Sequence, residues 1–461
     1  MLFSKKSLFK IIFPLILQQI FTVTIGMVDS LMVSSAGEAA VSGVSLVSSL
    51  DLLLIYCFSA LASGGAIVTA QFIGRGDTDL AKKSAKQLIY VTTIVASVIA
   101  ILVIIIRYPL LSLLFGNVED AVMSSAQDYF FFIALSFPML GLYDSGAAIL
   151  RSMGKSMESL TISVIMNIIN VIGNAILIYS FGMGAAGAAI ATLISRSAGA
   201  VIIIINVHSR KRTVYIEKLF RWQADKKIIK SILRIGVPSG IENGMFQFGK
   251  LLTQSLISSL STAAIAANAI AGTLSNYQYM PGGAIGLATV TVIGQCVGAG
   301  EKEQAKKYSR ILVGLTYLCL WTVCLFTVLF AKPIIGAYGV SAEASETAYT
   351  LLIMHSIIAA IIWPTAFTIP HSFRAASDVR FPLIISATSM WIFRVASSFF
   401  LALSEVTVFG LTIPGLGLGV LGVWIAMFLD WLFRAVIYAF RYFKGKWLDH
   451  SLFKKAEPKT N

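Results

Sequence analysis

Charged residues are scarce in this chain of 461 residues. Only 13% of the residues are Asp, Glu, Lys or Arg, 57% are hydrophobic, and the mean hydropathy is +0.82. Because a soluble domain carries about 25% charged residues, this composition excludes an ordinary soluble protein. A net charge of +14 suggests a nucleic-acid partner in a soluble chain. Here the basic residues gather at the ends of apolar runs, so we expect no nucleic-acid partner.

Cysteine and histidine, the residues that build many metal and catalytic centres, are also rare, with four of each. Cys57, Cys296, Cys319 and Cys324 all fall inside apolar runs, and no C-x-x-C or Cys/His spacing occurs. Neither a disulfide framework nor a zinc site is therefore indicated. The sequence also lacks a nucleophile motif and a soluble catalytic domain, so we expect a protein that is not an enzyme and needs no cofactor.

Long apolar runs are abundant, and each is long enough to cross a lipid bilayer as a helix. They predict an all-α integral membrane protein with twelve transmembrane helices in two six-helix lobes related by pseudo-two-fold symmetry. The predicted spans are residues 11–34, 40–72, 87–106, 122–149, 157–181, 185–207, 232–258, 264–297, 309–331, 346–371, 382–403 and 415–440.

The basic residues between these spans alternate in density along the chain. They precede the first span and follow every second span, whereas the opposite loops offer only Arg107 and Lys332. Since positively charged loops remain in the cytoplasm, this asymmetry predicts that both termini are cytoplasmic. We expect a multi-pass protein of the plasma membrane, from its short loops that of a bacterial inner membrane, and a monomer.

The first part of the chain recurs 224 positions later, as shown by Pro14 with Pro238, Gln71 with Gln295, and Gly74 with Gly298. The repeat predicts an N-terminal lobe over 1–207, a cytoplasmic linker over 208–230, a C-terminal lobe over 231–445 and a cytoplasmic tail over 446–461. Membrane proteins built from two helical repeats often bind a ligand between them, so the duplication indicates a transporter. Pro14 and Pro238 are predicted helix-bend positions.

Ionisable residues inside predicted spans are candidates for function, because they are costly in a bilayer. Asp29 is the strongest candidate for binding a cation or proton, since its own helix offers no cation within two turns. Asn170 and Asn174 lie one helical turn apart, and Thr192 of the next span adds a hydroxyl. Such oxygen ligands suit a hard cation such as Na⁺. The alternative is that the Asn side chains only join helices by hydrogen bonds.

The other charged residues in the spans leave alternatives open. Glu242, Asp51, Lys250 and Arg394 are candidates for the substrate cavity or for coupling in the second lobe. Lys250 would otherwise form a static pair with Asp51 or Glu242, and a structural role for Arg394 is equally open. Asp430 is expected to form an ion pair with a cation four residues later on the same helix, Arg434.

Several motifs together resemble the MATE (multidrug and toxic compound extrusion) family over essentially the whole chain. They are Pro14 followed fifteen residues later by Asp29, and the segments Ala70–Gly76, Arg151–Gly154, Asn167–Asn170, Gly187–Thr192, Ile235–Pro238 and Gly294–Gly300. The resemblance implies efflux of drug-like, mostly cationic organic compounds driven by sodium or protons. It also implies that Asp29, Asn170, Asn174 and Thr192 match the family's cation site, with Asn174 where some members carry a carboxylate.

A second departure lies in the seventh span. Many members place a Glu two turns after the proline, where this chain has Phe246, whereas its own acid is Glu242. Two rival functions remain open. The first is a lipid-linked oligosaccharide flippase of related architecture, although the spans offer few cations for a pyrophosphate. The second is a membrane receptor without transport, which the duplicated halves disfavour.

Overall fold

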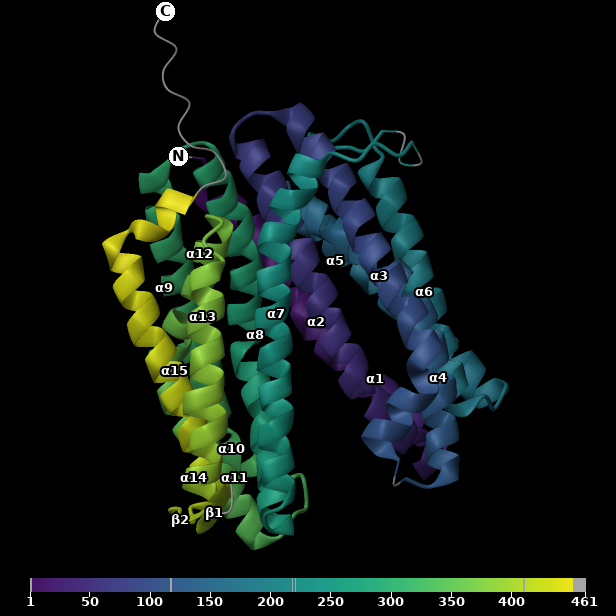
Figure 1. Cartoon of the computed structure of the whole chain (residues 1–461), viewed down its shortest axis with the longest axis vertical. Coiled ribbons are helices and arrows are strands. Elements are labelled where there is room, and N and C mark those ends of the chain that lie inside the picture. The colour runs from purple at the N-terminus through teal and green to yellow at the C-terminus, as the bar shows by residue number, and fades with distance from the viewer. Residues whose placement is uncertain (1, 117, 218, 220, 409–410, 451–461) are drawn as a thin grey trace, which may run out of the picture. The chain divides into compact units, whose positions relative to one another are not determined.

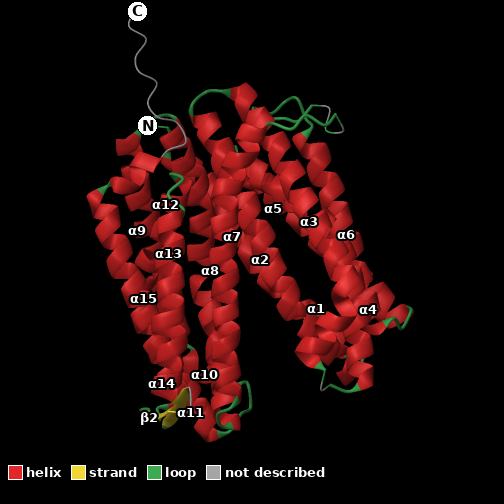
Figure 2. Cartoon of the chain, viewed as in Figure 1, coloured by secondary structure: helices red, strands yellow, loops and turns green. Residues whose placement is uncertain are grey.

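The computed structural model describes residues 2–116, 118–217, 219, 221–408 and 411–450. Helices make up nearly all of this part of the chain (Figure 2). By contacts the chain divides into two compact units, Met1–Gly240 with Gly294–Gly300, and Ile241–Ile293 with Glu301–Asn461.

The first unit is built from six long helices and one turn of π-helix, η1. Helix α4 packs against α2, α3 and α6, and α5 packs against α1 and α6 (Figure 1). The apolar core between them includes Phe58, Phe130 and Phe137, all buried. The elements are α1 (Lys5–Ser34), α2 (Glu38–Gly74), α3 (Thr78–Phe115), α4 (Asp120–Ser152), α5 (Ser156–Asn174), η1 (Ala175–Ser180) and α6 (Gly184–Val207).

The second unit contains the remaining helices and a two-stranded antiparallel sheet. Helix α15 packs against α14, η3 and η2, and the apolar core includes Trp363, Trp424 and Trp431. The elements are α7 (Lys226–Ser258), which begins in the first unit, α8 (Thr262–Gly298), α9 (Lys302–Leu329), α10 (Ala331–Gly336), α11 (Ala342–Trp363), η2 (Pro364–Thr368), α12 (Ile369–Ala375), α13 (Arg380–Thr388), η3 (Ser389–Ala396), α14 (Ser397–Ala402), β1 (Glu405–Val408), β2 (Leu411–Pro414), α15 (Gly419–Lys444) and η4 (Lys446–His450).

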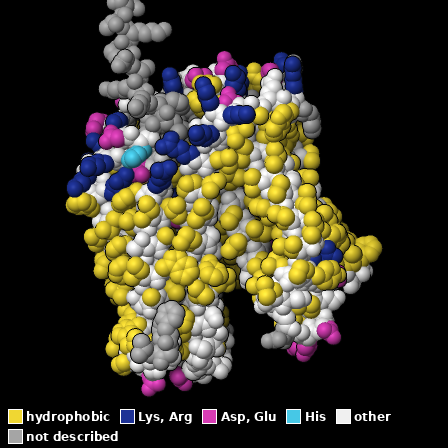
Figure 3. Space-filling model, in the orientation of Figure 1, with side chains coloured by type: hydrophobic (Ala, Val, Ile, Leu, Met, Phe, Trp, Pro, Cys, Tyr) yellow, Lys and Arg dark blue, Asp and Glu magenta, His cyan; other side chains and the backbone are white. Residues whose placement is uncertain are grey.

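Eleven of the described helical segments are long and apolar enough to cross a membrane. The predicted span over 232–258 also forms a single helix, α7, but its charged and amide side chains lower its hydropathy. In each unit, hydrophobic side chains cover the flanks of the helices and Lys and Arg gather at one end (Figure 3). The all-α membrane fold predicted from the sequence is therefore confirmed.

The helices differ from the prediction mainly in their irregularities. Three spans contain a π-helical turn, at η1, η2 and η3, and the last two predicted spans are separated by the hairpin β1–β2, which the sequence analysis did not predict. In the hairpin Glu405 pairs with Pro414 and Val408 with Leu411. Apolar periodicity carries no signal for a π-turn, because one extra residue per turn changes the hydrogen bonds and not the composition.

The end of α8, from Gly294 onward, belongs to the first unit, and there it crosses α2 closely. A Cβ atom on Gly74 would collide with the carbonyl group of Gln295, and a Cβ atom on Gly298 would collide with that of Gln71. These four residues are repeat partners, so the same glycine contact occurs once in each direction. Nearby, the Gln295 side chain donates a 2.8 Å hydrogen bond to the Ser152 carbonyl oxygen. The glycines are required because only a backbone without Cβ atoms allows this approach.

We expect Gly74→Ala and Gly298→Ala each to destabilise the protein by about 1–3 kcal/mol, because an added methyl group overlaps the opposing backbone. Thermal unfolding of the purified protein in detergent measures this. Gly272→Ala is the matched control on α8, since nothing lies within 4 Å of its Cβ position. Equal melting temperatures for Gly298→Ala and Gly272→Ala would contradict the close crossing.

Candidate functional site

The strongest candidate site lies in the first unit, where α1, α5 and α6 bring Asp29, Asn170, Asn174 and Thr192 together. The Asn174 amide nitrogen donates a 2.8 Å hydrogen bond to Asp29 Oδ1. The Asn170 amide nitrogen, in the orientation that satisfies both of its ends, donates to Asp29 Oδ1 at 2.8 Å and Oδ2 at 3.1 Å. The four residues that the sequence analysis grouped are thus in contact.

Thr192 closes the other side of the Asn170 amide. In that orientation the Asn170 oxygen accepts a 3.3 Å hydrogen bond from the Thr192 hydroxyl, which lies 2.9 Å from the Ala188 carbonyl oxygen of its own helix. Asn170 and Asn174 are buried, with 6% and 1% of their surfaces exposed, whereas Asp29 is half-buried. The carboxylate is therefore reachable from one side and held by amides on the other.

One polar atom of this group has no partner among the described residues. Asn174 Oδ1 is buried and accepts no hydrogen bond. A buried acceptor without a donor is costly, and a bound cation or water would satisfy it. The Asp29 carboxylate and the free Asn174 amide oxygen are oxygen ligands of the kind that suits Na⁺, so these residues fit a hard cation, and the same carboxylate fits a proton.

Local helix geometry positions this site. Asn174 is the last α-helical residue of α5, and the π-helical turn η1 begins at Ala175. A π-turn shifts the side chains that follow it relative to those before it, and such turns are frequent at functional sites. A small buried apolar cluster of Met32, Val33, Ile178 and Ala188 packs α1, η1 and α6 together.

Asp51 is paired within the first unit, which corrects one alternative. Its Oδ2 atom lies 3.0 Å from Arg196 Nη2, and Arg196 Nη1 donates a 2.8 Å hydrogen bond to the Ser136 hydroxyl. The partner of Asp51 is therefore Arg196 rather than Lys250. Because both side chains are largely buried, removing either one would strand the other charge.

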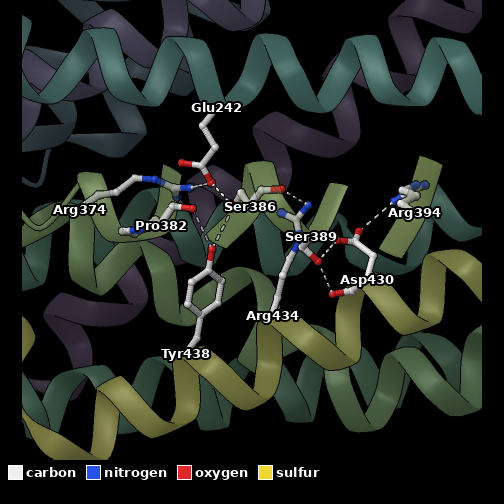
Figure 4. Close-up of polar contacts among 9 residues, drawn as sticks. All are labelled: Glu242, Arg374, Pro382, Ser386, Ser389, Arg394, Asp430, Arg434 and Tyr438. Carbon is white, nitrogen blue, oxygen red and sulfur yellow. Dashed lines mark hydrogen bonds and ion pairs between the residues drawn. The ribbon is translucent and has the colours of Figure 1, made fainter. Parts of the chain in front are cut away.

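Glu242 is also paired, and Arg374 is its partner (Figure 4). Glu242 Oε1 accepts hydrogen bonds from Arg374 Nη2 at 2.7 Å and from the Ser386 hydroxyl at 2.6 Å. Ser386 also contacts the Tyr438 hydroxyl at 2.9 Å. A static pair between Glu242 and Lys250 was therefore wrong. The buried Glu242 Oε2 accepts no hydrogen bond from the described residues.

Asp430 lies at the centre of a second ionic group (Figure 4). Arg434 Nε donates a 2.6 Å hydrogen bond to Asp430 Oδ1, which confirms the predicted pair. The Ser389 hydroxyl donates to the same oxygen, and Arg394 Nη1 lies 3.7 Å from Oδ2. Arg394 and Ser389 are five residues apart on η3, so the π-turn directs both toward Asp430. Arg394 thus has an acidic partner.

Lys250 is the exception among these charges. Its Nζ lies 6.0 Å from the centre of the Phe246 ring, and its side chain is exposed. It forms no ion pair with a carboxylate among the described residues. Phe246, where relatives are expected to carry an acid, is also approached by two guanidinium groups, those of Arg394 and Arg434, each 5.5 Å from the ring centre.

The two predicted bend positions lie inside continuous helices. Pro14 is within α1 and Pro238 within α7. Proline supplies no amide hydrogen, so the carbonyl groups of Lys10 and Arg234 lose their helical donors. A functional bend at either position stays a prediction.

Sequence reasoning missed several residues of these groups. Arg196 is the one arginine in the predicted span 185–207, and a charge in such a span was a usable signal. Arg374 was not among the candidates, although its largely buried side chain pairs with Glu242. Ser386, Ser389 and Tyr438 carry no charge, and only the folded helices bring them to the carboxylates.

Comparison with known proteins identifies the family. The family model MatE matches residues 14–176 and again residues 238–400, the same shift as from Pro14 to Pro238. The chain is 27% identical over 459 residues to the "Uncharacterized transporter YisQ" of Bacillus subtilis, covering 97% of this chain and 96% of that protein. It is 25% identical over 458 residues to the "Probable multidrug resistance protein NorM" of Thermotoga maritima, covering 96% and 93%.

Solved structures agree at the level of the fold. An outward-facing multidrug resistance MATE family transporter superposes with a TM-score of 0.87 at 19% identity, covering 96% of both chains. A MATE in the bent conformation superposes with a TM-score of 0.85, also at 19% identity and with the same coverage. With its two matched halves together spanning most of the sequence, the chain belongs to the MatE family of membrane transporters.

Proposed function

We propose that this protein is a secondary active multidrug efflux transporter that exports drug-like, mostly cationic organic compounds in exchange for Na⁺ or H⁺. The observation that carries the proposal is the group of Asp29, Asn170, Asn174 and Thr192. It offers a carboxylate that forms no ion pair with a basic side chain of the described residues, next to a buried amide oxygen without a donor. Relatives described as probable multidrug resistance proteins support the substrate class.

Coupling would follow from differential affinity. The two lobes would rock between an inward-open and an outward-open state, and binding of the coupling ion at Asp29 shifts this equilibrium only if the two states bind it unequally. Drug and ion would then favour opposite conformations of the same equilibrium. Each would lower the affinity of the protein for the other by the same factor, because such coupling is reciprocal. The duplicated halves support a mechanism of this kind.

The surroundings follow from the same proposal. The protein would lie in the plasma membrane of a bacterium, with both termini in the cytoplasm and as a monomer. The concentration of basic residues at alternate loops supports the cytoplasmic placement of the termini. An apolar, Phe- and Met-rich interior would suit varied substrates, because Met side chains adapt to different shapes.

We expect Asp29→Asn to abolish dye efflux while the protein remains folded in the membrane. The amide keeps the shape of the side chain, but it has no negative charge to attract a cation and does not take up a proton. The measurement is efflux of an organic cation from proteoliposomes, first under a sodium gradient at fixed pH and then under a proton gradient without sodium. Asp128→Asn, an exposed carboxylate on α4, is the matched control and should transport normally.

Each result of this assay has a defined meaning. Efflux under sodium alone makes the four residues a sodium site, and efflux under protons alone makes Asp29 the titrating group. Normal transport by Asp29→Asn removes that residue from the mechanism. If the wild type moves no organic cation under either gradient, the proposal fails and the lipid-linked oligosaccharide flippase becomes the first alternative.

We expect Asn174→Ala to weaken coupling-ion affinity by about tenfold, because it removes a charge-assisted hydrogen bond to Asp29 and a candidate ligand oxygen. If Na⁺ is the coupling ion, the variant should need more sodium for half-maximal efflux and recover its rate at saturating sodium. An unchanged sodium dependence would restrict Asn174 to packing. A loss that saturating sodium does not relieve would indicate damage to the fold, and thermal unfolding would detect it.

A further inference from the structure

The second unit holds more positive than negative charge around one aromatic ring. Lys250, Arg394 and Arg434 all place their charged groups within 6.0 Å of the centre of the Phe246 ring. The carboxylate in contact with this group is Asp430. Three cations therefore share one acid among the described residues. A cation inside a membrane helix is costly unless an anion compensates its charge.

Asp430 pairs with arginines rather than with Lys250, and its buried Oδ2 atom accepts no hydrogen bond from the described residues. Its Oδ1 atom already accepts hydrogen bonds from Arg434 and Ser389, its Oδ2 atom lies beside Arg394, and the side chain is fully buried. The other nearby acid, Glu242, is bonded to Arg374 and Ser386. The acids Asp430 and Glu242 are thus committed to arginines, and Lys250 has no acid as a partner among the described residues.

The backbone holds Lys250 and Arg394 on facing helices. A Cβ atom on Gly249 would collide with the Met390 side chain, so α7 approaches η3 closely at the residue before Lys250. The residue before Gly249 is Phe248, and the centre of its ring lies 6.0 Å from the centre of the Trp391 ring. The π-turn then directs Arg394 toward Asp430. Packing therefore holds the backbones that carry Lys250 and Arg394 close to each other.

The two cations differ in access. The Lys250 side chain is exposed, whereas 11% of the Arg394 side chain is exposed. Phe248 and Trp391 add half-buried or exposed aromatic surface beside them. A ligand that joins a flat apolar body to one anionic group would match this pattern, because the ring system packs on the aromatic side chains and the anion neutralises the ammonium group.

We propose that Lys250 and Arg394, beside Phe246, form a binding site for the carboxylate of an amphipathic aromatic substrate. The proposal rests on the proposed export function and refines its substrate class. An exporter of organic cations with this site would also take zwitterions, compounds that carry a carboxylate in addition to a cationic group. Lys250 supplies the accessible charge, and Arg394 supplies a fixed donor whose position is set by Asp430.

The test uses two dyes that differ at one group. Rhodamine 110 carries a free carboxylate, and rhodamine 123 is its methyl ester. Fluorescence polarisation would measure the binding of each dye to the purified full-length protein in detergent. We expect Lys250→Met to weaken rhodamine 110 binding about tenfold or more, with rhodamine 123 binding unchanged, since one charge-assisted interaction is lost. Lys250→Arg should restore binding of the carboxylated dye.

Lys332→Met is the matched control. Lys332 also lies over an aromatic ring of the second unit, 5.5 Å from the centre of Tyr349, and is not one of the cations around Phe246, so its removal should leave both dyes bound as in the wild type. Arg394→Gln is the second variant and should weaken rhodamine 110 more than rhodamine 123. Thermal unfolding of each variant would separate a lost contact from a lost fold.

Three results would overturn the inference: no binding of rhodamine 110 to the wild type, equal weakening of both dyes by Lys250→Met, or no weakening of either. Its failure is distinguishable from that of the proposed function, because binding is measured without a gradient. If the protein exports rhodamine 123 but Lys250→Met does not weaken rhodamine 110 binding, the proposed export function stands and the carboxylate site is rejected. If rhodamine 110 binding depends on Lys250 but neither dye is exported, the carboxylate site stands and the export function is rejected.

Discussion

A charge buried among membrane helices must find a partner in the protein, because neither lipid nor distant water can neutralise it. Both units are organised by this requirement. In the first unit Asp51 of α2 meets Arg196 of α6, and in the second unit Glu242 of α7 meets Arg374 of α12. The partners in each pair are more than 100 residues apart in sequence. The pairs therefore specify which helices lie side by side, in addition to the apolar contacts that any two such helices can make.

The exceptions to this rule coincide with the places that we assign to ligands. Asp29 is held by amides rather than by a cation, so its negative charge remains available to an ion or proton. Lys250 is near other cations and has no acid as a partner among the described residues, so its positive charge remains available to an anion. Each unit thus combines buried ion pairs, which fix the fold, with a charge that has no oppositely charged partner among the described residues, Asp29 in the first unit and Lys250 in the second. Substrate and coupling ion would be selected by these charges.

Irregular backbone positions the side chains of both sites. A π-turn follows Asn174, and another contains Ser389 and Arg394. Each turn rotates the helix so that neighbouring polar groups converge, at the cost of weaker helical hydrogen bonding. The glycine crossing of Gly74 and Gly298 has a different role, since it brings two backbones into contact where side chains would hold them apart. Its occurrence in both repeats indicates that this contact belongs to the duplicated architecture rather than to one site.

The sequence by itself determined the order of the apolar spans, the duplication from Pro14 to Pro238, and the placement of Asn170 and Asn174 on one face of a helix. These follow from hydropathy, from self-similarity and from the helical period, which are local properties of a chain, whereas the match of Asp29 and Thr192 to the same cation site came from the resemblance to the MATE family. Only the tertiary structure decided that Arg196 pairs with Asp51 and Arg374 with Glu242, and that Lys250 is left with neither. Such pairing depends on which helices pack together and on how π-turns rotate them, and a difference of one residue per turn leaves composition and hydropathy unchanged.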